Sequence, residues 1–141
     1  MEEIKQVIVV RKDLNMRKGK MCAQVAHASM KIILDQMERT TRQYVTLDSV
    51  DVFYQEWRIL IKQDSPLDKW LADKFTKIVV SVDSEEELMS LYVKAQSAGL
   101  PNALIQDAGK TEFKEPTYTC IAIGPDEAEK IDELTGELPL I

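Results

Sequence analysis

Short apolar runs rich in β-branched residues recur along this chain of 141 residues. Each run is six to eight residues long, a length typical of a strand that is buried in a sheet. The predicted strands are 4–10, 77–82, 102–107 and 117–124.

Between and after the predicted strands lie stretches in which apolar residues recur at helical spacing. The predicted helices run from 18 to about 39, from 85 to a stop at Gly99, and from an opening at 124–127 to about 134. Asp83 and Ser84 are the expected cap of the second helix, and the acidic residues of its first turn favour the positive helix start.

The segment 40–77 has the weakest pattern. Ser65 and Pro66 predict the cap and first turn of a short helix over 66–75. Before it, large apolar residues over 50–61 recur at helical spacing, although the same residue types also favour strands. We interpret that part as helical.

The order of these elements, β-α-(insert)-β-α-β-β-α, predicts the α/β fold class. We expect a single-domain mixed four-stranded β-sheet with helices on both faces, spanning 1–141, because a chain of 141 residues suits one domain. Hydrophobic residues make up 45% and charged residues 30%, an ordinary balance for a globular protein. No apolar run approaches the ~20 residues that a membrane span needs.

The N-terminus and the cysteines bear on the compartment. The chain begins with acidic residues and lacks a small-residue cleavage site, so a cytoplasmic location is expected. Cys22 and Cys120 have neither metal-ligand spacing nor the density of a disulfide scaffold. Both are therefore expected to be buried thiols.

One polar line crosses the first predicted helix. At about 100° per residue, Lys20, Gln24 and His27 lie within a sector about 60° wide, and apolar residues occupy most of the remaining surface. Most of this helix is therefore expected to be buried. Polar residues on an amphipathic helix usually form its solvated face. This line of three polar side chains indicates a functional site only if a second group of polar residues lies against it in the fold.

Charge is unevenly distributed along the chain. The net charge of −6 argues against a nucleic-acid partner. Residues 1–42, however, carry nine cations against five acids (+4), and the remainder carries nine against nineteen (−10). Four cations precede or begin the helix with the polar line: Arg11, Lys12, Arg17 and Lys18. Such a loop attracts phosphate, although basic loops of this size often bind nothing.

A second polar group follows the predicted strand that ends at Asp107. Gly109, Lys110 and Thr111 come next and suggest a phosphate-binding loop. A Walker loop needs a further glycine five positions before the Gly-Lys pair, where this chain has Leu104, so NTPase activity is disfavoured.

Asp107 and Thr111 lie where open α/β folds commonly bind ligands, at an edge of the sheet. If strand 102–107 lies beside strand 4–10, Asp107 faces the start of the helix that carries Lys20. The second polar group then meets the polar line.

The spaced motifs together resemble those of type 2 peptidyl-tRNA hydrolases. In order, they are a strand ending in VVRKDL, then M-x-KGK-x-x-AQ-x-x-HA, LIQDAGKT, a strand ending in IGP, and a close TGELPLI. The resemblance covers about 5–38 and 66–141. This chain departs from the family's pattern at Arg17, where a glycine is expected, at Lys110, where arginine is commoner, and by about 25 additional residues over 40–64.

The resemblance implies hydrolysis of the ester that joins a peptide to the terminal ribose of tRNA, which frees the tRNA. It places Lys20, Gln24, His27, Asp107 and Thr111 at the family's active-site positions. It implies peptidyl-tRNA as the partner, with no membrane involved.

Ester hydrolysis needs an activated water, a proton for the leaving oxygen and stabilisation of the oxyanion. We expect direct attack by water, because the family offers no obvious serine or cysteine triad. Asp107 is expected to orient or deprotonate the water, and Lys20 to neutralise negative charge. Thr111 and Gln24 are expected to hold the carbonyl or the water. His27 is either an acid or base or a structural residue.

Six side chains are expected to bind substrate: Arg11, Lys12, Arg17, Lys18, Gln24 and Lys110. No metal site and no cofactor are expected, because one histidine and scattered acids do not form a ligand set.

Two other functions stay open. A non-catalytic module that binds tRNA or a protein would keep the fold and Lys20 without needing Asp107. A hydrolase of another small ester would share the chemistry without needing the basic loop. The presence of Lys20, Asp107 and Thr111 together favours the enzyme. The sequence leaves a homodimer open.

Overall fold

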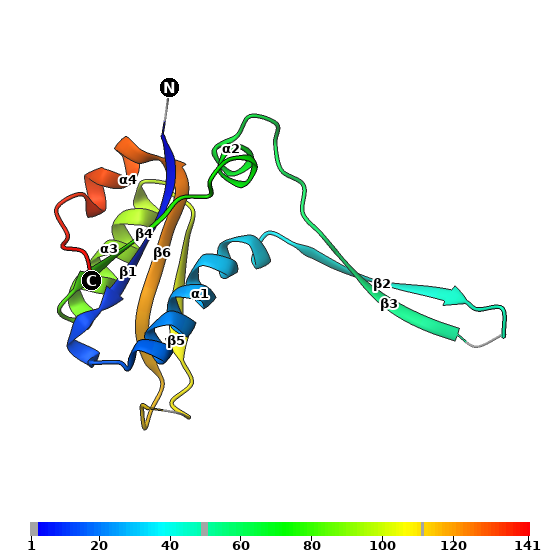
Figure 1. The fold of residues 1–141 in the computed structure, drawn as a ribbon, viewed down its shortest axis with the longest axis horizontal. Helices are drawn as coiled ribbons and strands as arrows, with labels where there is room; N and C mark the ends of the chain where they lie inside the picture. The colour runs from blue at the N-terminus through cyan, green and yellow to red at the C-terminus, as the bar shows by residue number, and fades with distance from the viewer. Residues whose placement is uncertain (1–2, 49–50, 111) are drawn as a thin grey trace.

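The computed structural model describes residues 3–48, 51–110 and 112–141 (Figure 1). The elements, in chain order, are β1 (Ile4–Arg11), the 3-10 turn η1 (Lys12–Leu14), α1 (Lys18–Leu34), β2 (Glu38–Val45), β3 (Asp51–Arg58), α2 (Pro66–Ala72), β4 (Lys77–Val82), α3 (Glu85–Ser97), β5 (Asn102–Asp107), β6 (Thr117–Glu127) and α4 (Ala128–Thr135). The predicted α/β class is confirmed.

Four of the strands form a mixed sheet in the order β4-β1-β6-β5, and β2 pairs with β3 in a separate two-stranded sheet. β1 runs parallel to β4 and antiparallel to β6, which is itself antiparallel to β5. The carboxyl ends of β1, β4 and β5 therefore meet at one edge of the sheet. Figure 1 shows α1 and α2 on one side of the sheet and α3 and α4 on the other, as expected.

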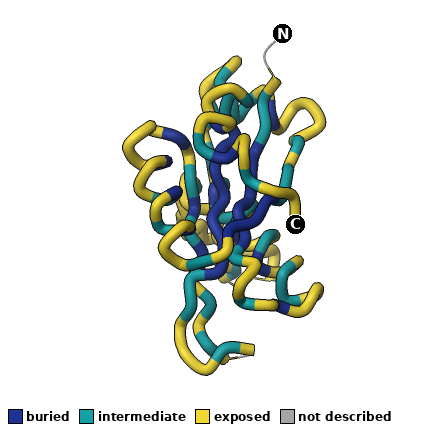
Figure 2. Tube along the Cα trace, turned by 90° about the vertical axis from the view of Figure 1, so that its left-hand side faces the viewer, coloured by how far each residue is buried: buried dark blue, intermediate teal, exposed yellow. Residues whose placement is uncertain are grey.

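Alternate residues of the central strands fill two apolar layers. Val7, Val9 and Ile121 pack under α3 and α4, whereas Ile8 and Cys120 pack under α1. Burial in Figure 2 is concentrated in these central strands, with exposed residues on the outer helices and loops. Both faces of β1 are covered, which explains its continuous apolar run.

Residues 51–61 are not helical, so our interpretation of this segment was wrong, and residue 50 lies outside the described residues. β2 and β3 form a hairpin that leaves the body between α1 and α2 (Figure 1). Their pairing is regular, from Glu38 opposite Arg58 to Val45 opposite Asp51. β-branched and aromatic residues make up half of each strand, and strand propensity prevails over the helical spacing.

Three predicted helix boundaries also shift. α1 ends at Leu34 rather than near residue 39, because the chain enters β2 at Glu38. α2 ends at Ala72. α4 begins at Ala128, since β6 continues to Glu127 opposite Ile4. The expected caps are confirmed: Ser65 Oγ accepts from the N–H of Asp68, and Ser84 Oγ from that of Glu87.

The expectation that most of α1 is buried was wrong. Only Gln24, Ala28 and Ile32 are buried in this helix, because it contacts the sheet along one stripe. Its outer face is apolar but solvent-exposed, and Cys22 lies there, contrary to the expected burial. Cys120 is buried as predicted. None of the described helices is long and apolar enough to cross a membrane.

Candidate active site

The site lies at the edge of the sheet where β1 and β5 end and α1 begins. β6 separates β1 from β5, so strand 102–107 does not lie beside strand 4–10. Asp107 still reaches the start of α1, because this helix packs across both β5 and β6. Asp107 and the polar line of α1 therefore do meet at Lys20, although β5 is not adjacent to β1 as the prediction assumed.

Lys20 and Asp107 form an ion pair across this edge. The Lys20 ammonium donates to Oδ1 of Asp107, and their side chains are only 12% and 10% exposed. The N–H of Gly109 donates to the other carboxylate oxygen at 2.9 Å. Lys20 lowers the pKa of Asp107, and the Gly109 hydrogen bond and nearby His27 act in the same direction, against the opposing effect of burial. Asp107 is therefore ionised at neutral pH.

Gly109 fixes the turn that follows Asp107. Its φ of +80° lies in the left-handed region, and a Cβ at this position would lie 2.5 Å from the carbonyl carbon of Glu115. Only glycine fits there without a shift of the loop. The Phe113 ring, from the same loop, lies 5.8 Å from Nζ of Lys20 and shields one side of the pair.

Gln24 points into the protein from the second turn of α1. It is 3% exposed, and its amide oxygen accepts a hydrogen bond of 2.6 Å from the Thr119 hydroxyl. The neighbouring Cys120 thiol donates to the Gln24 carbonyl at 3.4 Å, and burial raises its pKa to about 11. Gln24 therefore ties α1 to β6 behind the ion pair.

His27 and Thr111 complete the predicted catalytic set. His27 is exposed on α1, seven residues and about 10 Å along the helix from Lys20. It is near enough to lower the pKa of Asp107 by its charge. Thr111 lies outside the described residues.

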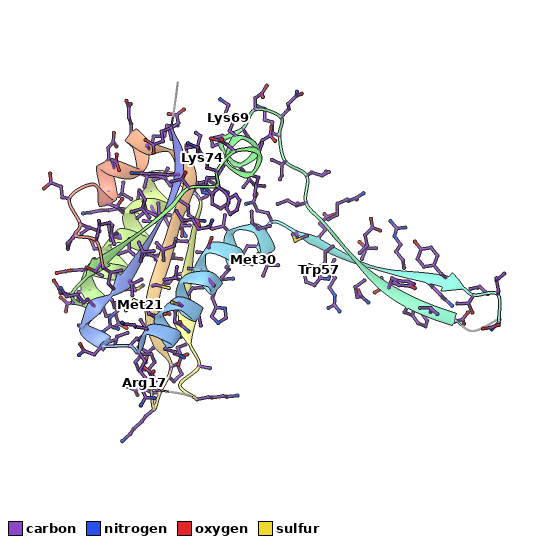
Figure 3. All side chains as sticks on the ribbon, in the orientation of Figure 1. Arg17, Met21, Met30, Trp57, Lys69 and Lys74 are labelled. Carbon is purple, nitrogen blue, oxygen red and sulfur yellow. The ribbon has the colours of Figure 1, made fainter. Side chains whose placement is uncertain are left out.

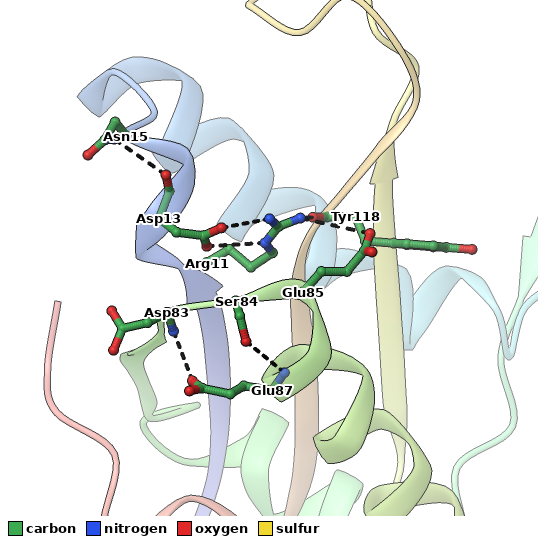
Figure 4. A network of polar contacts seen from close by, with 8 residues as sticks. All are labelled: Arg11, Asp13, Asn15, Asp83, Ser84, Glu85, Glu87 and Tyr118. Carbon is green, nitrogen blue, oxygen red and sulfur yellow. Dashed lines mark hydrogen bonds and ion pairs between the residues drawn. The ribbon is translucent and has the colours of Figure 1, made fainter.

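Arg11 sits at the end of β1 within a network of polar contacts (Figure 4). Its guanidinium donates to both carboxylate oxygens of Asp13, at 3.2 and 2.7 Å, and to the Tyr118 carbonyl at 3.1 Å. A Glu85 oxygen lies 3.9 Å away. These contacts engage one N–H of each nitrogen in the guanidinium that was expected to bind phosphate. In this structure, Arg11 joins the basic loop to β6 and α3.

The other predicted phosphate ligands are exposed at the same edge: Lys12, Arg17, Lys18 and Lys110. The Arg17 side chain is 90% exposed and lies 3.8 Å from a Glu112 oxygen (Figure 3). The Arg17 side chain makes no capping hydrogen bond to the first turn of α1, and the Arg17 N–H donates to a Glu112 carboxylate oxygen at 3.3 Å. The edge thus combines cations with a sheltered lysine–carboxylate pair, which is suited to orienting a water and stabilising an oxyanion.

Comparisons with known proteins bear on this arrangement. Residues 4–141 match the family described as peptidyl-tRNA hydrolase PTH2. A protein from Sulfurisphaera tokodaii named peptidyl-tRNA hydrolase is 44% identical over 137 residues, which cover 97% of this chain and 98% of the relative. The chain belongs to the peptidyl-tRNA hydrolase PTH2 family. The resemblance inferred from the sequence motifs is confirmed.

Further relatives of this family support the assignment. Proteins of the same name from Metallosphaera sedula and Methanocaldococcus jannaschii are 41% and 40% identical over 138 residues, covering 98% of this chain and 100% of each relative. A solved structure of a protein of unknown function from Agrobacterium tumefaciens strain C58 has a TM-score of 0.55 and 10% identity, covering 100% of this chain and 99% of that chain. That likeness concerns the fold alone.

In this member of the PTH2 family, three residues missed by the sequence analysis support the site. An Asp-x-Gly spacing is typical of turns in which the carboxylate accepts a backbone N–H, so Gly109 had a local signal. Thr119 had none, because it lies 95 residues from Gln24. Phe113 likewise meets Lys20 only in the folded chain. Among the described residues, no group of three or more metal-ligating side chains is found.

Proposed function

We propose that this chain hydrolyses the ester bond between peptide and tRNA in peptidyl-tRNA and thereby releases free tRNA for reuse. The observation that carries this conclusion is the family match over residues 4–141, which spans the whole polar cluster at the sheet edge. The basic edge and the sheltered ion pair supply chemistry that this reaction needs.

A water molecule attacks the ester carbonyl carbon, and the bond from that carbon to the ribose oxygen breaks. Asp107 orients this water, since a carboxylate with a lowered pKa is a hydrogen-bond acceptor but a weak base at neutral pH. The Lys20 ammonium stabilises the negative charge that develops on the carbonyl oxygen. Thr111 is assigned to the same oxygen or to the water.

The proton lost by the water ends on the ribose oxygen. His27, exposed on the face of α1 that carries Lys20, is assigned to carry it. Gln24 was predicted to hold the substrate or the water, but its side chain is 3% exposed and its amide oxygen accepts from the Thr119 hydroxyl, so it is assigned to support α1 behind the ion pair. No group bound covalently to the substrate is required.

Lys12, Arg17, Lys18 and Lys110 are assigned to the phosphates of tRNA. All four are exposed at the edge where α1 begins. Arg11 was predicted to join them. Its contacts with Asp13 and Tyr118 favour support of this loop instead.

We also propose that 1–141 acts as a single domain, in the cytoplasm where translation takes place, and that it forms a homodimer. Peptidyl-tRNA is the nucleic-acid partner, and no metal or other cofactor enters the scheme.

The deciding experiment measures release of a labelled N-blocked amino acid from its tRNA by the purified chain. Lys20→Ala should abolish release, whereas Lys31→Ala, which removes an exposed lysine paired with Asp35 on the same helix, should leave it unchanged. Binding of tRNA without release would contradict the proposal and indicate a non-catalytic module. Equal cleavage of the N-blocked amino acid from a simple alcohol would indicate a small-ester hydrolase.

A further inference from the structure

Glu112 lies on the loop between β5 and β6, against the start of α1. Its carboxylate contacts Arg17 at two points: Oε2 accepts the Arg17 N–H at 3.3 Å, and Oε1 lies 3.8 Å from Nε of the guanidinium. Arg17 is one of the four cations assigned above to the phosphates of tRNA, and Figure 3 shows it at the start of α1. An anionic group of the protein itself therefore lies beside a cation that is assigned to an anionic substrate.

The two side chains differ in exposure. The Arg17 side chain is 90% exposed, whereas the Glu112 side chain is only 27% exposed. The guanidinium thus extends into solvent, where a phosphate of an RNA strand can reach it, while the carboxylate is held closer to the body of the protein.

Contacts on both sides of Glu112 anchor the loop that carries it. Before it, the N–H of Gly109 donates to Asp107 at 2.9 Å. After it, Phe113 packs against the apolar layer under α1 and lies over Nζ of Lys20. These contacts do not involve Arg17, so they should keep Glu112 in place when the guanidinium turns to another partner.

The ion pair between Glu112 and Arg17 is weak enough to be exchanged. Exposed pairs contribute little free energy, because water and salt screen them. A phosphate can accept two parallel hydrogen bonds from a guanidinium, an arrangement stronger than a single contact at 3.8 Å. A tRNA phosphate can therefore displace the carboxylate. The free energy of breaking the pair is then subtracted from the free energy of tRNA binding.

We propose that Glu112 competes with the phosphates of tRNA for Arg17 and thereby weakens the binding of tRNA at this edge of the sheet. The inference rests on the proposed function, which assigns Arg17 to phosphate. It adds a residue that opposes binding to a set of residues that favour it. Glu112 acts through Arg17 and not on the ester.

The competition matters most for release of the product. Deacylated tRNA carries the same phosphates as peptidyl-tRNA, so contacts with phosphate bind product and substrate alike. Strong phosphate contacts would leave the enzyme occupied by tRNA after hydrolysis. Glu112 therefore favours release of the product and limits inhibition by tRNA that carries no peptide.

Direct binding of deacylated tRNA to the purified chain, at one fixed salt concentration, tests the proposal. Glu112→Gln should lower the dissociation constant about fivefold, which corresponds to ~1 kcal/mol, the upper end for an exposed pair. Glutamine keeps an oxygen that can accept the Arg17 N–H, so the loop should stay in place. The inhibition constant of deacylated tRNA in the hydrolysis assay should fall by the same factor.

Two comparisons isolate the contact with Arg17. Glu115→Gln is the matched control, because it removes the same charge from an exposed position of the same loop, and it should change the dissociation constant less than about twofold. The second comparison introduces Glu112→Gln into a chain that carries Arg17→Ala. The gain in affinity should disappear there if Glu112 acts through Arg17.

Each result separates the proposals. An unchanged or higher dissociation constant for Glu112→Gln overturns the competition. An equal gain in the control, or in the chain with Arg17→Ala, also overturns it, since a general loss of negative charge then explains the effect. If Arg17→Ala alone leaves tRNA binding unchanged, both the phosphate contact of Arg17 and the competition fail. Absence of hydrolysis in the parent overturns the proposed reaction alone, because binding of deacylated tRNA requires no chemistry.

Discussion

Replacement of Asp107 by asparagine tests the centre of the proposed mechanism. Asparagine keeps the shape of the side chain and still has an oxygen that can accept the N–H of Gly109. It removes the negative charge that faces the Lys20 ammonium. The water then loses its charged acceptor, and Lys20 loses the partner that holds it in place.

The structure sets the expected size of the effect. Both side chains are nearly buried, so the ion pair is a charge-assisted hydrogen bond sheltered from water, worth about 1.5–3 kcal/mol. The water is also no longer oriented for attack, which raises the free energy of the transition state further. We expect kcat/KM to fall at least about 100-fold, which corresponds to ~2.7 kcal/mol.

Stability should change with pH in a defined direction. The folded-state pKa of Asp107 lies below its ordinary value of 3.8, so the ionised carboxylate stabilises the fold above that pH. This stabilisation is lost as the pH falls through the lowered pKa. The difference in unfolding free energy between parent and Asp107→Asn should therefore be constant near neutral pH and shrink only below about pH 4.

The assay combines initial rates on N-blocked aminoacyl-tRNA with urea unfolding of each variant. Asp132→Asn is the matched control, because Asp132 is also paired with a lysine, Lys5, at 2.7 Å, but on α4. Near-native turnover of Asp107→Asn, or an equal loss in the control, would refute the assigned role.

Three further predictions concern the surroundings of the pair. Gly109→Ala should lower the unfolding free energy by about 1–3 kcal/mol and reduce kcat/KM, since a side chain strains this turn; unchanged urea unfolding would contradict this. Arg17→Ala with Lys18→Ala should flatten the slope of log tRNA affinity against log salt by up to about two units at similar saturating turnover, and an unchanged slope would exclude these contacts. By mass spectrometry, a thiol reagent at neutral pH should label exposed Cys22 and leave buried Cys120 unmodified until the chain unfolds, and early labelling of Cys120 would refute its burial.

The central sheet was predictable because its strands are covered on both faces. Such strands read as continuous β-branched runs, and β4 and β5 have the bounds expected from their sequences. The β2–β3 hairpin was not recognised because residues such as Phe53 and Trp57 recur at a helical spacing as well as an alternating one. The choice between the two depended on pairing with β2, which no local pattern reveals.

The burial of α1 illustrates a different limit. Its sequence carries apolar residues over most of its surface, yet a helix buries only the stripe that meets a neighbour, here β5 and β6. Gln24, from the polar line, lies on that stripe because Thr119 satisfies its amide oxygen. The positions of Lys20 and Asp107 in the family motifs were enough to predict that they meet. The contact of Phe113 with Lys20 was not predictable, because it depends on how the loop after β5 folds.

The ion pair at the sheet edge joins residues that are 87 positions apart. Closing a loop of that length has an entropic penalty of about 4 kcal/mol, so the contact cannot form early from local structure alone. Helices such as α1 and α3 can appear within microseconds. Recovery of hydrolysis during refolding should therefore lag behind recovery of helical circular dichroism. The time course of regained hydrolysis would therefore report when β5 docks onto the rest of the sheet.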